Sequence, residues 1–382
     1  MISGLVLSFI TILMGNFYPK FYDFVQREIN MIDFSELVLE FMLSFLLFAG
    51  ALHTDYNKLS KARGPVLSFA TIGVVLSTAI TATAIYFLLQ LFGYNIDYIY
   101  CLLFGALISP TDPIAVLGIL KKEKIPKSLE VKITGESLFN DGVGVVLFLS
   151  LLHIAEQGGA IDASFITELL LLEILGGVGL GLAGGYLALQ MMKRIDHYQT
   201  EVLITLALVT GAYSLALALH FSGPLAMVLA GLMIGNQGKK MAMSEQTLEY
   251  VDKFWEMIDE ILNAVLFVLI GLEILILSFE WQYIALGLIA ALLVVLIRYL
   301  SLLTPSVLLG YKRTFAPHAL KIMTWGGLKG GISIALALSL SSEMPRDLIL
   351  SMTYVVVIFS LLVQGLTIGK LVNKYKRESK LG

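Results

Sequence analysis

Two stretches of the sequence decide the fold: Ile108-Ser109-Pro110-Thr111-Asp112-Pro113 and Gly135-Glu136-Ser137-Leu138-Phe139-Asn140-Asp141-Gly142. Both lie within residues 105–150, in segments that are otherwise long and apolar enough to cross a bilayer. An ionisable side chain is costly in the hydrocarbon layer, and by default it marks a substrate or proton path. We therefore expect the acidic residues of these two stretches to carry the function.

The composition predicts an all-α polytopic membrane protein. With 57% hydrophobic and 14% charged residues among 382, the chain has more apolar surface than one soluble core would use. The apolar runs are roughly 20 residues long and lack the period-two alternation of barrel strands, so the spanning elements are helices. Cys101 is the single cysteine, and no cluster of His and Cys has zinc-ligand spacing. We expect no cofactor, and the net charge of -3 indicates no nucleic-acid partner.

The apolar runs predict twelve transmembrane helices. Basic residues support this number, because Lys and Arg in short loops gather on the cytoplasmic side of a membrane. Twenty-one of the 26 lie after even-numbered helices or in the C-terminal tail, and three lie after odd-numbered helices. The chain is therefore predicted to be a multi-pass protein of the cell membrane with both termini in the cytoplasm. The helices are expected at about 2–18, 37–53, 64–92, 98–120, 133–153, 165–192, 200–219, 223–237, 255–277, 282–309, 317–341 and 347–373.

Two prolines are expected to break the fourth helix. Pro110 and Pro113 remove two amide donors and clash with the carbonyls of Ala106 and Ser109, so the helix should unwind between Ser109 and Asp112. Unwound backbone in a membrane persists where it is buried in protein or lines a cavity, and such breaks build the ion sites of secondary transporters. An ordinary proline kink is the alternative, but Asp112 between the prolines favours an ion site.

The fifth helix carries two acidic residues with different orientations. Ser137 and Asp141 are four residues apart and share a face, where their oxygens can bind a hard cation. Glu136 points about 140° away from Asp141 and needs a cation of its own. Arg298 in the tenth helix is the candidate partner, because a guanidinium pairs bidentately with a carboxylate. A structural salt bridge is the preferred interpretation of Glu136, with direct ion binding as the alternative.

The eleventh helix contains Trp325-Gly326-Gly327-Leu328-Lys329-Gly330-Gly331, with four glycines around one lysine. Glycine in a membrane helix either allows close helix packing or lets the backbone open. If the backbone opens opposite the proline break, Lys329 would neutralise the facing helix ends and nearby acids. A plain packing motif is the alternative.

Together with the Arg298 helix, these three motifs resemble the NhaP/NHE branch of monovalent cation/proton antiporters, over nearly the whole chain. The resemblance implies an NhaA/NhaP-like inverted-repeat fold in which the unwound fourth and eleventh helices cross. It also implies a homodimer in the lipid bilayer. Relatives often have thirteen helices, and many carry an acidic residue in the neighbourhood of Ala49. The implied parts are a mobile core at about 64–153 and 282–373, scaffold and dimer helices at about 2–53 and 200–277, and a linker helix at about 165–192.

The resemblance also implies the roles of the site residues. Asp141 would carry the exchanged proton or cation, and Ser137, Thr111 and Asp112 would complete the site directly or through water. The sodium ligands would be Asp141, Ser137 and Thr111. Asn140 is counted with the cation- and proton-binding residues, and its place beside Asp141 is similar to the arrangement in electroneutral exchangers.

We therefore expect a sodium/proton antiporter, possibly accepting lithium, in which one carboxylate binds either a proton or a cation. A potassium/proton antiporter and a cation channel are the alternatives, although the sequence has no ring-forming filter loop. An intramembrane protease would need a second catalytic Asp in a Gly-x-Gly-Asp setting or a Ser and His pair in the membrane. Neither pattern is found, so the chain is expected not to be an enzyme.

Overall fold

The computed structural model describes residues 33–112, 125–157, 163–273, 280–308 and 318–380, with positions 18, 20, 24, 27, 116–118, 120, 123 and 310 between them. The described residues are almost entirely helical and form no strand. Seven helical segments among them are long and apolar enough to cross a membrane, which confirms the predicted class. The first predicted helix lies almost entirely outside the described residues. The segments are Phe34–Leu52, Arg63–Leu91, Lys127–Glu156, Leu170–Met192, Tyr198–Ala218, Trp281–Leu308 and Arg346–Tyr375.

The first half of the chain contains long helices joined by short turns. Asp33 and Asp55 cap two helical segments: the Asp33 side chain accepts one hydrogen bond from a backbone N–H group of the first turn, and the Asp55 side chain accepts two. The elements are α3 (Phe34–Glu36), η1 (Leu37–Met42), α4 (Leu43–Leu52), α5 (Tyr56–Lys61), α6 (Arg63–Ser68), η2 (Phe69–Gly73), α7 (Val74–Leu91), α8 (Tyr98–Ile108), α10 (Lys127–Glu156) and α11 (Ala163–Met192).

The second half differs from the prediction at its ninth helix, which begins about ten residues earlier than expected. Thr247, Val251 and Trp255 recur at helical spacing and are buried, so tertiary packing extends the helix through a polar stretch. The elements are α12 (Tyr198–Ala218), α13 (Gly223–Met233), η3 (Ile234–Gly238), α14 (Lys239–Met241), α15 (Glu245–Glu273), α16 (Trp281–Leu308), α17 (Ala319–Trp325), α18 (Gly331–Leu338), α19 (Arg346–Phe359), η5 (Ser360–Gln364) and α20 (Gly365–Lys380).

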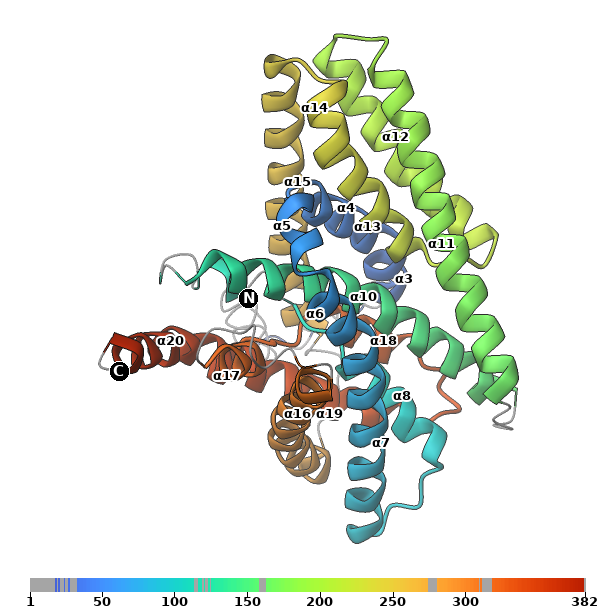
Figure 1. Ribbon diagram of the computed structural model, residues 1–382. Coiled ribbons are helices and arrows are strands. Elements are labelled where there is room, and N and C mark those ends of the chain that lie inside the picture. The colour runs from blue at the N-terminus through green and yellow to red at the C-terminus, as the bar shows by residue number, and fades with distance from the viewer. Residues whose placement is uncertain are drawn as a thin grey trace.

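The helices pack as two groups with α10 between them (Figure 1). In one group α4 packs against α13 and α15, while α11 and α12 pack against α13. In the other group α7 packs against α8 and α16, and α19 packs against α16 and α18. Helix α10 contacts α8 of the second group and α13 of the first. A side chain on α10 can therefore face either group.

Two helices are broken at the same level of the second group. Helix α8 ends at Ile108, and the backbone N–H of Asp112 donates a 2.8 Å hydrogen bond to the carbonyl oxygen of Leu328. Leu328 lies in the gap between α17 and α18. The predicted breaks are therefore confirmed, and the two unwound segments pair with each other. Pro113 lies outside the described residues.

Glycine is required where the breaks meet. A Cβ atom on Gly330 would lie 2.5 Å from Oδ2 of Asp112, closer than real Cβ contacts allow. The glycines around Lys329 therefore allow one unwound segment to approach the other. This contact places the Asp112 carboxylate directly against the start of α18.

Candidate ion-binding site

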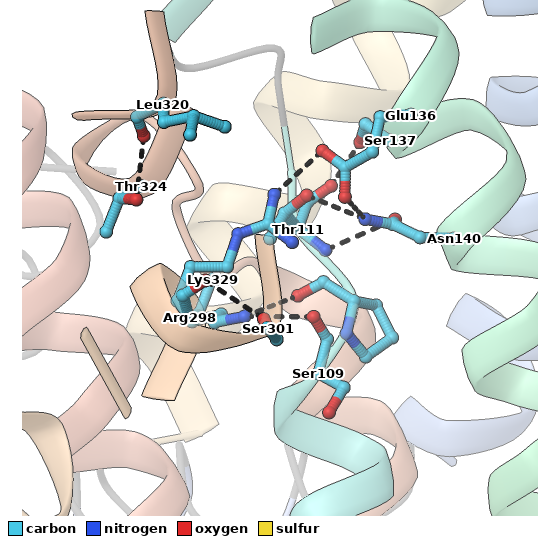
Figure 2. Close-up of polar contacts among 11 residues, drawn as sticks. Ser109, Thr111, Glu136, Ser137, Asn140, Arg298, Ser301, Leu320, Thr324 and Lys329 are labelled. Carbon is cyan, nitrogen blue, oxygen red and sulfur yellow. Dashed lines mark hydrogen bonds and ion pairs between the residues drawn. The ribbon is translucent and has the colours of Figure 1, made fainter. Parts of the chain in front are cut away.

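Lys329 lies at the crossing and binds the end of α8. Its Nζ donates 3.0 Å hydrogen bonds to the carbonyl oxygens of Ser109 and Pro110, and the side chain is nearly fully buried (Figure 2). Its backbone N–H donates to Oγ of Ser360 at 2.9 Å. The last carbonyls of a helix lack partners and carry the negative end of the helix dipole. Lys329 thus supplies the charge and the donors that the broken helix lacks.

Glu136 and Arg298 form an ion pair in the protein interior. Nη2 of Arg298 lies 2.7 Å from Oε2 of Glu136, and the two side chains are 4% and 2% exposed. The pair links α10 to α16 (Figure 2). Arg298 binds Glu136 and Lys329 binds backbone carbonyls, so neither basic side chain forms an ion pair with Asp141 among the described residues.

Asn140 connects this ion pair to the unwound segment. Its Nδ2 donates to Oε1 of Glu136 at 2.7 Å and to Oγ1 of Thr111 at 2.9 Å. Its Oδ1 accepts a longer hydrogen bond, 3.4 Å, from the backbone N–H of Thr111. Both amide donors are therefore used, and Asn140 is absent from the cavity wall that holds Asp141. The sequence grouped Asn140 with the cation ligands, but its position fits a residue that holds the unwound segment against α10.

A cavity of about 650 Å³ lies beside the crossing. Four of the residues expected at the site line it: Asp141 and Ser137 from α10, and Thr111 and Asp112 from the break. Asp141 is 8% exposed, and Ser137 Oγ donates a hydrogen bond to the carbonyl oxygen of Thr111. The hydroxyl of Ser137 accepts no hydrogen bond from a described residue, so the wall offers carboxylate and hydroxyl oxygens of the kind that hard cations prefer.

The donor set fits a monovalent cation better than a transition metal. In the part of the chain that the structure describes, no group of three or more His, Cys, Asp or Glu side chains could hold a metal ion. Among the described residues, His53 supplies the one imidazole on the cavity wall, and its ring lies 3.9 Å from Asp252 of α15, while the wall has no cysteine. The geometry therefore allows Asp141 to bind one small ion of low charge, or a proton.

The cavity extends away from the crossing toward polar residues of three other segments. Asp55 and Lys58 after α4, Glu130 in the first turn of α10, and Asp252 and Glu256 of α15 also line it. These segments border the loops that the distribution of basic residues predicts to be cytoplasmic. The contribution of α15 was not identified from the sequence. A signal existed, because Asp252, Glu256 and two further polar cavity residues recur at helical spacing on one face of that helix.

A helical membrane protein with two discontinuous helices that meet beside a cavity carrying carboxylate and hydroxyl oxygens has the architecture of a secondary transporter. Residues 1–374 match the model of the family described as sodium/hydrogen exchanger, transmembrane, and the chain belongs to this family.

Individual relatives agree with this assignment. The chain is 50% identical over 362 residues to the Na(+)/H(+) antiporter NhaP of Pseudomonas aeruginosa, covering 94% of this chain and 85% of the relative. It is 36% identical over 350 residues to the Na(+)/H(+) antiporter NhaH of Halobacillus dabanensis, covering 89% and 83%. The fold is similar to that of the sodium proton antiporter MjNhaP1 from Methanocaldococcus jannaschii, with a TM-score of 0.75, 17% identity and 98% of each chain covered.

Proposed function

We propose that this protein exchanges sodium for protons across the cell membrane, with Asp141 as the carboxylate that both ions share. The observation that carries the proposal is the state of Asp141: it is buried on the cavity wall and forms no ion pair with a described residue. A buried carboxylate without a partner is costly, so it needs a proton or a cation to be neutral. The names of the NhaP and NhaH relatives support sodium and protons as the two ions.

Competition at Asp141 couples the two fluxes. When sodium binds the carboxylate with oxygens of Ser137 and Thr111, the proton must leave to water in the cavity. Either ion neutralises the carboxylate, and the neutral form crosses the apolar barrier far more easily than the charged form. The empty, charged carboxylate does not cross. A site that has released sodium on one side of the membrane therefore returns only after it has bound a proton or another cation.

The cycle is electroneutral if Asp141 is the single group that titrates. Asn140 has no charge and uses its amide on Thr111 and Glu136, so it adds no second proton. Each crossing then carries one proton or one monovalent cation against the same fixed charge. Lithium, which has the same charge and hard-ligand preference, is expected to replace sodium. Such exchange would serve pH and sodium homeostasis.

The two groups of helices fit the parts of an alternating-access transporter. The group containing α7, α8 and α16 to α19 holds the crossing and would move with α10 as the core. The group containing α4 and α12 to α15 would be the scaffold and the interface of a homodimer, and α11 would be the linker helix. The cavity borders the predicted cytoplasmic loops, so this conformation is assigned as open to the cytoplasm, the side on which both termini are placed.

Proton flux in proteoliposomes tests the proposal. A pH-sensitive dye inside the vesicles is expected to report proton movement when sodium or lithium is added, with saturation and with reversal when the gradient is inverted. Asp141→Asn keeps the side-chain volume but removes the titratable charge, so it should abolish the exchange. Asp97→Asn is the matched control, because Asp97 is exposed and its side chain does not cap α8. Sodium-driven proton flux retained by Asp141→Asn would refute the assignment.

A further inference from the structure

Helix α15 presents a row of polar side chains to the cavity. Asp252, Glu256, Asp259 and Asn263 all line it, at spacings of four, three and four residues. These spacings place them on one face of the helix. The row begins near the predicted cytoplasmic loops and runs toward the crossing of the broken helices.

Asn263 differs from the rest of the row because it is buried and incompletely hydrogen-bonded. The residue is 7% exposed. Its Nδ2 donates to the backbone carbonyl of Asp259 at 2.7 Å and to Oδ1 of Asp259 at 3.1 Å, which fixes the orientation of the amide. Its Oδ1 accepts no hydrogen bond from any residue that the structure describes. A buried oxygen of this kind is normally satisfied, so the vacant acceptor beside a carboxylate points to a bound donor or cation.

The charges along the row single out the same position. Asp252, nearer the mouth, is paired with Lys239 of α14 at 2.6 Å. Asp259 forms no ion pair with any described residue, and it is partly buried. Glu256, between them, is exposed, so Asp259 is the first partly buried carboxylate of the row without an ion pair to a described residue, and it lies next to the vacant oxygen of Asn263.

This position lies close to the crossing. Leu266, three residues after Asn263, packs so tightly against α18 that a Cβ atom on Gly331 would lie 2.6 Å from its Cδ1. The preceding residue, Gly330, packs against the Asp112 carboxylate. The row on α15 and the wall that holds Asp141 therefore meet within one continuous cavity.

We infer that Asp259 and Asn263 form a second binding position for a monovalent cation, on the α15 wall, which a sodium ion occupies before it reaches Asp141. The role of this position in loading Asp141 rests on the proposed exchange activity. Its ability to bind a cation does not. One carboxylate oxygen, one amide oxygen and cavity water suit a partly hydrated monovalent ion. A negative charge at this depth raises the local cation concentration at Asp141 without taking part in the crossing step.

The kinetic test separates loading from transport. In everted membrane vesicles, Asp259→Asn and Asn263→Leu are expected to raise the KM for sodium by about three- to tenfold and to leave kcat within about twofold. Asn263→Asp keeps an oxygen at the same place and is expected to have a KM at or below that of the unmodified protein. Glu260→Gln is the matched control, because Glu260 is adjacent to Asp259, exposed and not on the cavity wall.

A binding test distinguishes this inference from the proposed function. Equilibrium binding of radioactive sodium to purified Asp141→Asn protein is expected to show weak residual binding, which the double variant Asp141→Asn/Asp259→Asn loses. Unchanged KM in both α15 variants, or no residual sodium on the Asp141→Asn protein, overturns the second site while leaving the role of Asp141 intact. Exchange retained by Asp141→Asn overturns the proposed function instead, and the residual binding still reports on α15.

Discussion

Removing one partner of the Glu136–Arg298 ion pair is expected to destabilise the protein strongly. Both side chains are almost completely buried, and the atoms that pair are 2.7 Å apart. Arg298→Ala leaves the Glu136 carboxylate in the interior without its guanidinium, and Glu136→Gln leaves the guanidinium without its carboxylate. An uncompensated buried charge lowers the free energy of unfolding by about 3 to 5 kcal/mol. Because Glu136 also binds Asn140, which holds Thr111, the loss should also loosen the unwound segment.

A double-mutant cycle measures this coupling. Thermal unfolding of each variant in one detergent should show two large single losses and a smaller loss in Glu136→Gln/Arg298→Ala than their sum, because the second change removes the charge that the first one left unpaired. The exposed pair Glu249 and Lys253 is the control: its atoms are 2.6 Å apart, but the side chains are 65% and 68% exposed. Glu249→Gln and Lys253→Ala should not change the unfolding temperature measurably. Additive losses at Glu136 and Arg298 would show that the two residues are not energetic partners.

Three further outcomes are expected. Lys329→Met leaves the carbonyls at the end of α8 without donors and should lower the free energy of unfolding by about 1 to 3 kcal/mol, measured by the same unfolding assay; an unchanged stability would mean that water replaces the ammonium. Gly330→Ala drives a Cβ atom against Asp112 and should reduce sodium-driven proton flux, whereas Gly211→Ala, with nothing within 4 Å, should not; equal fluxes would contradict the tight crossing. The rate and direction of one-for-one exchange should not depend on an imposed voltage. A cycle that moved one net elementary charge would instead change in free energy by about 2.3 kcal/mol per 100 mV. A flux reversal point that shifts when voltage is clamped with potassium and valinomycin, after potassium is shown not to be a substrate, would reveal a second titrating group such as Asp112.

The parts of the site that depend on local chemistry could be predicted from the sequence. Proline at position 110 cannot continue the hydrogen bonding of α8, so the break follows from one residue. Arg298 was identified as the partner of Glu136 because few basic residues fall at membrane depth, and the structure places the two side chains in contact. These inferences required composition and spacing but no knowledge of how distant helices pack.

The parts that depend on packing between distant segments could not be predicted in the same way. Asn140 neighbours Asp141 in the chain, yet adjacent residues on a helix point about 100° apart, and the positions of Thr111 and Glu136 decide which of them faces the cavity. The polar first half of α15 has too few apolar residues to be read as a span, and its helix is stabilised by burial of Val251 and Trp255 against other elements. Its contribution to the cavity depends on that packing.

Hydrogen bonds at the crossing join the two helix breaks to each other and to α10, and this bears on how sodium would bind from each side of the membrane. The Asp112–Leu328 bond and Lys329 fasten the two breaks to each other, and Ser137 fastens them to α10. In the proposed exchange cycle, the oxygens around Asp141 would then move as one unit and keep their arrangement. The proposed sodium site at Asp141 would therefore have the same intrinsic affinity from either side. A difference in apparent sodium affinity between the two membrane faces would then arise along the path of the ion toward Asp141, where the polar row of α15 borders the cavity.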